Sequence, residues 1–338
     1  MLKKLLLLAI SLVAIEAIGA TKPIKVIFDT DMGNDVDDVL ALDMLYKYHD
    51  EGTIDLLGIV SSKREMGSVK FIDAMNTLYG HPNIPIGIAK IYPEENYVDP
   101  TTRDRLNFAD YTVAKHNYAY TTKEWEGLPD GYKLMRELLA KAKNKSVVIV
   151  AVGFSTNMAR LFDSEGDEYS PLGGKELFAK KVSKVVIMAG HFSRDKAEYN
   201  IRHDLSAAIK FINECPVPMY FTDFLLGASV HYPWQAVYQG YKYCENHPLV
   251  VSFEYYREMP HNRPLWDPTA VLFAAEPEGG YAMVSKPGVV EIDSRGVTKF
   301  VEKRGGNRYI YSVDDSQRKK IVDRVVELTL RNPYNHNK

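Results

Sequence analysis

A short acidic segment, residues 29–38, constrains the fold of this chain more than any other part of its sequence. The segment follows the apolar residues 26–28, which are typical of a strand buried on both faces. After it, apolar residues recur at helical spacing from Val36 to Tyr48. We therefore predict that the segment is the turn from a buried strand into a helix. Parallel sheets place their binding sites at such turns.

Five of these ten residues are carboxylates, and none is a lysine or an arginine. Acids crowded into one turn repel one another, and a helix amino terminus offsets only about half an elementary charge. The segment is therefore predicted to bind a cation. Because all the available ligands are oxygens, calcium or magnesium is favoured over zinc or copper, and a flexible carboxylate-rich loop favours Ca2+. The alternative is a solvent-exposed helix start that Asp37 or Asp38 caps, although a cap needs only one acid.

Two other acidic motifs share part of this pattern. An EF-hand loop has glycine at its sixth position and glutamate at its twelfth. Counted from Asp29, Gly33 is fifth and Leu40 is twelfth, so an EF-hand is excluded. A phosphatase of the haloacid dehalogenase type also begins with a strand and Asp-x-Asp, but it normally continues with threonine or valine where this chain has Gly33. That phosphatase remains an alternative.

The segment resembles the amino-terminal signature of the nucleoside hydrolases, an Asp-x-Asp-x-Gly turn closed by an Asp-Asp pair and a helix. In this chain residues 29–33 match the turn, and Asp37-Asp38 is the pair. The turn is longer than in the best-known members and contains Asp35 as an additional acid, whose role stays open. Asp29 is expected to orient the turn and not to bind the metal directly.

Three later motifs extend this resemblance, and the first lies at residues 151–157. These residues predict a strand end, a glycine-containing turn and a helix. In the family a threonine at this strand end binds calcium through its backbone carbonyl, and Val152 holds that position. Without the resemblance, an ordinary strand-to-helix turn would be the favoured interpretation.

The second motif, Glu198-Tyr199-Asn200, is similar to a Glu-Phe-Asn motif whose Glu and Asn bind the ribose hydroxyls in the family. We expect Glu198 and Asn200 on an extended loop, where residues i and i+2 point the same way. The alternative is a polar loop before a helix that begins at Asp204. The connection from Gly190 is shorter than in well-known members, and an upstream sugar-binding asparagine of the family has no clear counterpart.

The third motif is Trp266-Asp267-Pro268. By themselves these residues predict a helix with Asp267 as its N-cap and proline at the first helical position. In the family an aspartate that opens the equivalent helix completes the calcium shell, and both roles can coexist. The preceding residue is often histidine in the inosine-uridine-preferring branch and tryptophan in a purine-preferring branch. Trp266 is therefore expected to contact the base.

The resemblance covers residues 24–275 and implies calcium-assisted hydrolysis of the N-ribosidic bond of ribonucleosides, with purine nucleosides preferred. Such cleavage needs an activated water below the sugar and stabilisation of the leaving base above it. The expected metal ligands are Asp31, Asp38, Asp267 and the Val152 carbonyl; the expected catalytic residues are Asp31 as general base and Asp37, which holds a ribose hydroxyl. A calcium-dependent ribose- or nucleoside-binding protein without turnover is an alternative, because the histidine acid is missing.

The rest of the chain predicts an α/β fold in a single domain over residues 21–338. Helical segments such as 69–79 alternate with strand-like segments at 54–60, 147–152, 182–188 and 217–221. This alternation predicts a mainly parallel central sheet with helices on both faces. A small β-rich carboxy-terminal appendage is predicted from residues 288–293, 297–304 and 307–312, which alternate like antiparallel strands, and a helix follows at 316–330.

Two aromatic segments are expected beside the site. Residues 92–130 contain Pro93, Pro100 and Pro129 among many aromatic residues and are predicted to be a long loop. This loop is either a lid over a flat substrate or a surface extension packed by its own aromatic side chains. Residues 232–266 are predicted to form a helical wall over the pocket.

The net charge and the amino-terminal residues limit which binding partners and which cellular location are expected. A formal net charge of −2 without a basic stripe argues against nucleic acid, so the expected partner is a small nucleoside. Residues 1–20 combine two lysines, an apolar run and small residues, as a signal peptide does, and Glu16 ends the run too early for a membrane anchor. We expect a secreted or periplasmic homo-oligomer, a dimer or tetramer. Cys215 and Cys244 either pair or stay free.

Overall fold

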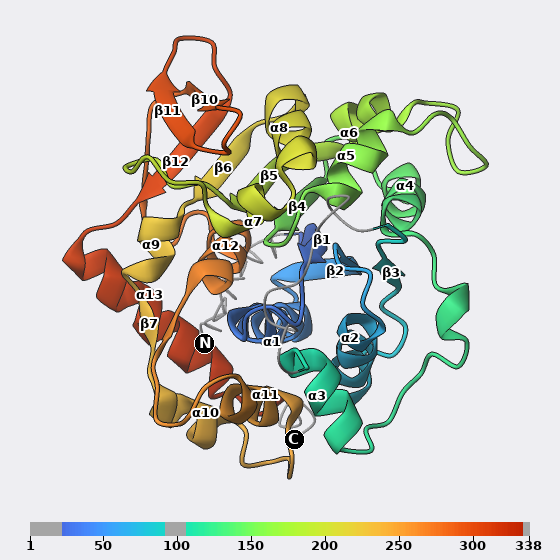
Figure 1. The fold of residues 1–338 in the computed structure, drawn as a ribbon, viewed down its shortest axis with the longest axis vertical. Coiled ribbons are helices and arrows are strands. Elements are labelled where there is room, and N and C mark those ends of the chain that lie inside the picture. The colour runs from blue at the N-terminus through green and yellow to red at the C-terminus, as the bar shows by residue number, and fades with distance from the viewer. Residues whose placement is uncertain (1–21, 92–105, 334–338) are drawn as a thin grey trace, which may run out of the picture.

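The computed structural model describes residues 22–91 and 106–333 (Figure 1). The expected signal peptide and the part of the predicted loop at 92–105 lie outside the described residues. Among the helices that are described, none is both long enough and apolar enough to cross a membrane.

A single large sheet forms the centre of the fold. Within the described residues it has ten strands in the order β11-β10-β12-β6-β5-β4-β1-β2-β3, with β9 joined to β12. Its central part is parallel and consists of β1 (Ile24–Thr30), β2 (Ile54–Ser61), β3 (Ile86–Ile88), β4 (Val147–Ala151), β5 (Val182–Met188) and β6 (Met219–Thr222). The predicted mainly parallel α/β fold is confirmed.

Both faces of the central strands are buried, which explains why their sequences are apolar at consecutive positions. Val26 and Phe28 of β1 belong to one hydrophobic core, and Ile27 between them belongs to the other. The first core is covered by α1 (Asp37–Asp50), α2 (Met66–Leu78), α12 (Trp266–Ala275) and α13 (Asp315–Thr329). The second is covered by α4 (Gly131–Lys141), α5 (Thr156–Asp163), α6 (Gly174–Lys181) and α8 (Leu205–Glu214).

The carboxy-terminal strands extend the main sheet. β10 (Gly288–Ile292) and β11 (Thr298–Glu302) are antiparallel, as predicted, and their hairpin projects from the body of the molecule (Figure 1). β12 (Arg308–Ser312), however, pairs in parallel with β6 and meets β10 at only one residue pair, while β9 (Met283–Val284) pairs with β12. The predicted appendage is therefore joined to the parallel sheet through β12.

The predicted long loop is partly helical, because residues 108–115 form α3 (Phe108–Lys115) and residues 125–127 form a 3-10 turn. Asn107 caps α3 by accepting a hydrogen bond from the Asp110 N–H at 2.9 Å. The Phe108 ring is buried edge-on against Phe71 of α2, with ring centroids 5.6 Å apart. The loop prediction is wrong for this part, since a cap and a buried aromatic residue together support a short helix.

The aromatic segment at 232–266, predicted to be a helical wall, is helical in about half of its length. It contains β7 (His231–Tyr232), α10 (Trp234–Gly240), α11 (Pro248–Tyr256) and β8 (Arg263–Pro264). Tyr255 of α11 stacks on Tyr111 of α3 with ring centroids 3.6 Å apart, so α3 and α11 are packed together. The shorter helices α7 (Tyr199–His203) and α9 (Phe224–Ala228) follow β5 and β6. Cys215 and Cys244 are both free.

Candidate active site

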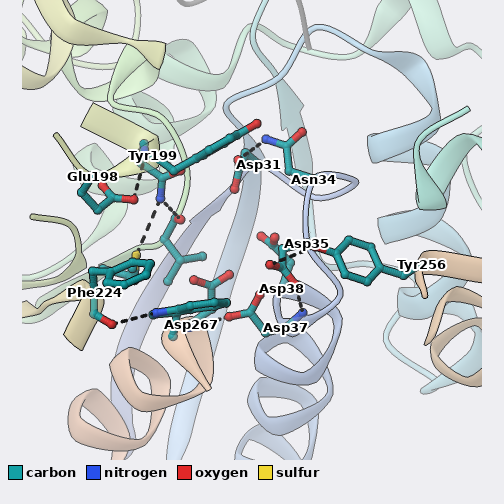
Figure 2. Close-up of a pocket in the computed structure, with 14 residues that line it drawn as sticks. Asp31, Asn34, Asp35, Asp37, Asp38, Glu198, Tyr199, Phe224, Tyr256 and Asp267 are labelled. Atoms are coloured by element: carbon teal, nitrogen blue, oxygen red, sulfur yellow. Dashed lines mark hydrogen bonds between the residues drawn. The ribbon is translucent and has the colours of Figure 1, made fainter. Parts of the chain in front are cut away.

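A pocket of about 270 Å³ lies at the carboxyl ends of β1, β4 and β5 (Figure 2). It is lined by Asp31, Asn34, Asp35, Asp37, Asp38, Val152, Met188, Glu198, Tyr199, Asn200, Phe224, Tyr256, Trp266 and Asp267. All eight residues to which the sequence assigned a site role lie in this lining. Segments more than 200 residues apart in the chain therefore meet at the edge of the sheet where a parallel fold places its ligands.

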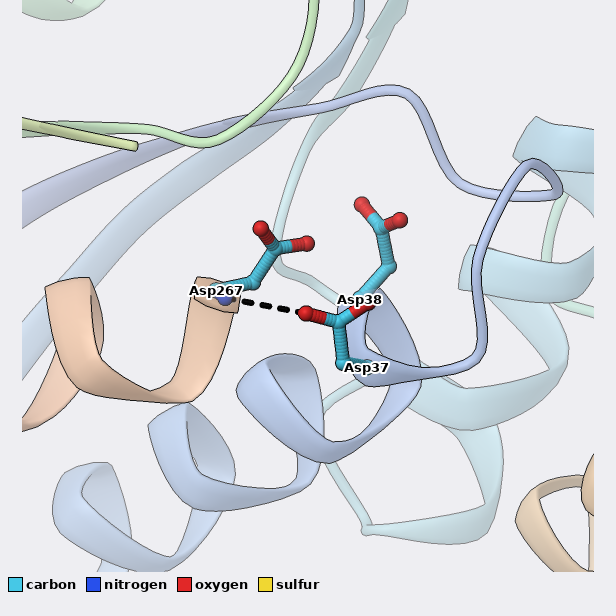
Figure 3. Close-up of side chains that lie close together, drawn as sticks. All are labelled: Asp37, Asp38 and Asp267. Atoms are coloured by element: carbon cyan, nitrogen blue, oxygen red, sulfur yellow. Dashed lines mark hydrogen bonds between the residues drawn. The ribbon is translucent and has the colours of Figure 1, made fainter. Parts of the chain in front are cut away.

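Three of the acids are close enough to share one cation. Single carboxylate oxygens of Asp37, Asp38 and Asp267 all lie within 4.8 Å of one another, and the three side chains are buried (Figure 3). This group includes Asp37, for which a sugar contact was expected, and it does not include Asp31, an expected metal ligand. The Thr30 hydroxyl donates a hydrogen bond to Asp38, which holds that carboxylate from the strand side.

Burial makes these carboxylates hard to ionise in the protein alone. It raises the pKa of Asp38 and of Asp267 well above the ordinary value, and the neighbouring charges of Asp31 and Asp37 add to the effect. The pKa values of Asp31 and Asp37 are raised as well, again mainly through burial. A divalent cation reverses this situation, because it stabilises the charged form of every carboxylate around it. The donor set, all oxygen and mostly carboxylate, therefore fits a hard cation such as calcium.

The start of α1 differs from the alternative in which Asp37 or Asp38 caps a solvated helix. Val36 occupies the N-cap position, no side chain caps the helix, and Asp37 and Asp38 lie buried in its first turn. Instead, Asp37 Oδ2 accepts a hydrogen bond from the Asp267 N–H at 3.0 Å. The Asp37 carboxylate of α1 thus caps the amino-terminal end of α12.

The same contact corrects the prediction for Asp267. Asp267 is not the N-cap of α12, because the helix already begins at Trp266 and Leu265 holds the cap position without a side-chain hydrogen bond. Since Asp37 accepts from the first turn of α12, Asp267 does not have to cap its own helix. Its carboxylate is left free to face Asp38 in the acid group.

Glu198 and Asn200 lie on the first turn of a helix and not on the expected extended loop. Glu198 is the N-cap of α7 and accepts hydrogen bonds from the Asn200 and Ile201 N–H groups at 2.9 and 3.3 Å. Burial raises its pKa to about 7. The Asn200 amide donates to the Val152 carbonyl oxygen at 2.8 Å. A carbonyl oxygen has two lone pairs, so Val152 can still offer one to a further ligand.

Two cations that the sequence reasoning missed, the buried Lys63 and the partly buried Arg263, provide counter-charge. Lys63 follows β2 and donates to the Asn34 side-chain oxygen at 2.8 Å, and Asn34 in turn donates to Asp31. Arg263 of β8 forms an ion pair with Asp35. The position of Lys63 directly after a strand of the parallel sheet was a usable signal, because the carboxyl ends of parallel strands meet at one edge. Arg263 offered no such signal.

The pairing with Arg263 gives Asp35 a structural role. The Arg263 guanidinium lies 4.7 Å from the centre of the Tyr256 ring and 5.1 Å from that of Trp266. It also donates to the Tyr256 hydroxyl oxygen at 3.1 Å. The additional acid of the turn therefore fastens the turn to the aromatic side of the pocket.

Three aromatic rings form that side of the pocket: Phe224, Tyr256 and Trp266. The Trp266 ring N–H donates to the Phe224 carbonyl oxygen at 2.9 Å, and the two ring centroids are 5.5 Å apart. The sequence reasoning singled out only Trp266. Among the residues that line the described pocket there is no histidine; His261 lies outside it, stacked on Phe253.

Comparisons with known proteins agree with this geometry. A family model described as inosine-uridine preferring nucleoside hydrolase matches residues 26–327. A search of curated protein sequences gives no match.

Among solved structures, a plant nucleoside hydrolase has a TM-score of 0.68 at 16% identity, and the match covers 92% of this chain and 100% of that one. An inosine-guanosine nucleoside hydrolase has a TM-score of 0.66 at 19% identity, covering 90% of this chain and 98% of that one. A purine-preferring ribonucleoside hydrolase from Gardnerella vaginalis has a TM-score of 0.66 at 18% identity, covering 90% and 99%. At these identities the structures share the fold.

Proposed function

Because this chain belongs to the inosine-uridine preferring nucleoside hydrolase family, we propose that it hydrolyses ribonucleosides to free base and ribose, with calcium bound and purine nucleosides preferred. The observation that supports this proposal most strongly is the composition of one pocket. It combines a group of three buried carboxylates, the Glu198-Asn200 pair and an aromatic wall. We propose that these parts bind the metal, the sugar and the base of a nucleoside, in that order.

Calcium is the metal that this donor set suits best. We propose that Asp38 and Asp267 hold it, together with Asp31 and the second lone pair of the Val152 carbonyl. Asp37 lies in the same group, which supports a role in binding either the metal or a ribose hydroxyl beside it. When bound, the ion would polarise a water beside it, which would make the proton of that water easier for Asp31 to remove.

The protein side chains have distinct tasks in the cleavage. Asp31 is the proposed general base, which takes a proton from the attacking water. Asp37, Glu198 and Asn200 are the proposed partners of the ribose hydroxyls. The bond to the base breaks through an oxocarbenium-like sugar cation, and the surrounding carboxylates stabilise positive charge as it develops.

The aromatic wall supports the purine preference. A purine that stacks on an aromatic ring gains about 0.5–1.5 kcal/mol. Once its N7 takes a proton from solvent, a cation-π attraction of up to about 2 kcal/mol is added. Pyrimidines lack N7 and gain little from this arrangement. The Arg263 charge beside Trp266 is offset by Asp35, so it does not oppose a cationic base at full strength.

A binding protein without turnover is the second candidate, and one observation favours it. The part of the pocket that the structure describes has no histidine to protonate the leaving base. Such a protein would bind nucleosides with calcium and release no ribose. The phosphatase alternative has lost its support, because the family match covers most of the chain.

A panel of nucleosides tests the proposal directly. Purified protein is incubated with inosine, guanosine, adenosine, uridine and cytidine, and free base and reducing sugar are measured. The proposal predicts equal amounts of base and ribose, formed faster from the purine nucleosides. Binding of inosine without release of ribose would support the binding protein instead.

A further inference from the structure

Lys63 is a fully buried lysine beside the proposed active site. Its side chain has no measurable exposure, and its Nζ donates to the Asn34 Oδ1 at 2.8 Å. An ammonium group is buried only where acceptors and negative charge replace the water it has lost. Lys63 is not among the residues that line the pocket, whereas Asn34 is. The lysine therefore meets the pocket through Asn34.

The chemistry of the three side chains fixes the orientation of the Asn34 amide. A lysine ammonium can only donate, and an ionised carboxylate can only accept. The Asn34 oxygen must therefore face Lys63, and its NH2 group must face Asp31, to which it donates a hydrogen bond at Oδ2 (Figure 2). If Lys63 were apolar, the amide oxygen would lose its donor, and only Asp31 would be left to orient the amide.

The backbone turn brings Asn34 back to Asp31. Gly33 has a φ of +119°, which side-chain-bearing residues rarely adopt. After this glycine the Asn34 N–H reaches the Asp31 carbonyl oxygen at 3.3 Å, while the Asn34 side chain reaches the Asp31 carboxylate. One carboxylate oxygen of Asp31, Oδ2, is thereby held by Asn34.

We propose that Lys63 and Asn34 are positioning residues for Asp31. Lys63 fixes the amide of Asn34, and Asn34 fixes the carboxylate in the orientation needed to take a proton from water. This inference rests on the proposed function, in which Asp31 is the general base. It assigns a task to a buried charge that neither the metal ligands nor the sugar contacts explain.

A double-mutant cycle tests the chain of contacts. Lys63→Met keeps most of the length of the side chain and removes its charge, and Asn34→Ala removes the contact with Asp31. With inosine, Lys63→Met should lower kcat about tenfold and Asn34→Ala about 10–100-fold, while KM changes less than about threefold, because misplacing a reacting group acts on the chemical step. The double variant should lose clearly less than the product of the two single losses, since part of the effect of Lys63 passes through Asn34.

Lys47→Met is the matched control. Lys47 is also buried, but it pairs with Asp43 inside α1, away from the pocket. This variant should lower the melting temperature and leave the kcat of the folded protein unchanged. Two results would overturn the inference while the proposed function stands. One is a kcat of folded Lys63→Met that equals that of the wild type, and the other is fully additive losses in the double variant. If Lys63→Met does not fold, an unchanged kcat in Asn34→Ala overturns it. A wild-type protein that releases no ribose would overturn the proposed function and this inference together.

Discussion

At the scale of single residues, the acidic residues of the pocket differ in the groups that they contact. Asp37, Asp38 and Asp267 face one another, and among the described residues none of them forms an ion pair with a lysine or arginine, whereas Asp35 pairs with Arg263. The sequence alone could not separate these acids, because all but Asp267 lie in one segment. Asp35 differs from the others because it pairs with Arg263 of β8, which lies more than 200 residues further along the chain.

Asp35→Asn should therefore leave metal binding intact and weaken the fold. The substitution leaves the Arg263 charge without its carboxylate in a site where that side chain is mostly buried. We expect a loss of about 1–2 kcal/mol of unfolding free energy, less than for a fully buried pair because Asp35 is partly exposed. Denaturant unfolding and a calcium titration measure the two effects. A large loss of calcium affinity would show that Asp35 is a ligand.

Trp266→Ala should lower kcat for inosine more than it raises KM. The attraction between the ring and a protonated purine exists only as the base leaves, so its loss acts on the transition state. A loss of about 1.4 kcal/mol corresponds to about a tenfold lower rate. Uridine hydrolysis should change less. Trp234→Ala on α10 is the control, because Trp234 lies outside the pocket lining.

A parallel loss for inosine and uridine, together with loss of calcium and stability, would contradict the base contact. It would show that Trp266 serves as a packing residue that positions Asp267. The hydrogen bond from its ring N–H to Phe224 is a contact through which such a role would act.

At the scale of elements, the site depends on the contact between α1 and α12. Asp37 of α1 accepts from the first turn of α12 at 3.0 Å, so the two helices that carry the acid group are tied to each other. α12 also packs on β4 and β5, whose carboxyl ends form the floor of the pocket. A small shift of α12 would thus separate Asp267 from Asp38.

A pair of substitutions separates the cap from the charge of Asp37. Asp37→Asn retains a side-chain oxygen for the Asp267 N–H, whereas Asp37→Ala removes it. Asp37→Ala should cost about 1 kcal/mol more unfolding free energy than Asp37→Asn, as the loss of a helix cap does. Both should lose activity. Equal stability of the two variants in denaturant unfolding would contradict the capping role.

Many of the helices and strands could be predicted from the sequence. The strand and helix around residues 29–38 follow from apolar periodicity, which depends only on local spacing. The helical start at Glu198 was missed, because Glu198-Tyr199-Asn200 carries no periodicity and the helix there is short. The capping of α12 by Asp37 could not be predicted, because it joins residues 230 positions apart and the local sequence offered Asp267 as a plausible cap. Arg263 was missed for the same reason, whereas the position of Lys63 after β2 was a usable signal.

At the scale of the whole molecule, the sheet separates two hydrophobic cores and brings buried carboxylates together at one edge. The site is therefore a source of instability unless a cation compensates it. Burial raises the pKa of Glu198 from an ordinary value of 4.5 to about 7, and it raises those of the acid group in the same direction. Folding thus favours the protonated carboxylates.

The stability of the chelated protein should fall as the pH rises. Glu198 binds its proton more tightly in the folded state, so its contribution is complete below about pH 4.5 and is lost as the pH rises through about 7. The melting temperature of chelated protein should be several degrees lower at pH 8 than at pH 5.5, and calcium should restore it at pH 8. A melting temperature that rises over this range in chelator would contradict this account.

The most direct test of the central claim measures ribose release from inosine in four samples. These are calcium-loaded wild type, exhaustively chelated wild type, chelated protein with calcium restored, and calcium-loaded Asp38→Asn or Asp267→Asn. The account predicts rapid release in the first and third samples, little in the second, and rates at least about 100-fold lower in the variants, because each removes a proposed metal ligand. Full activity in chelated protein, or wild-type rates in both variants, would contradict it.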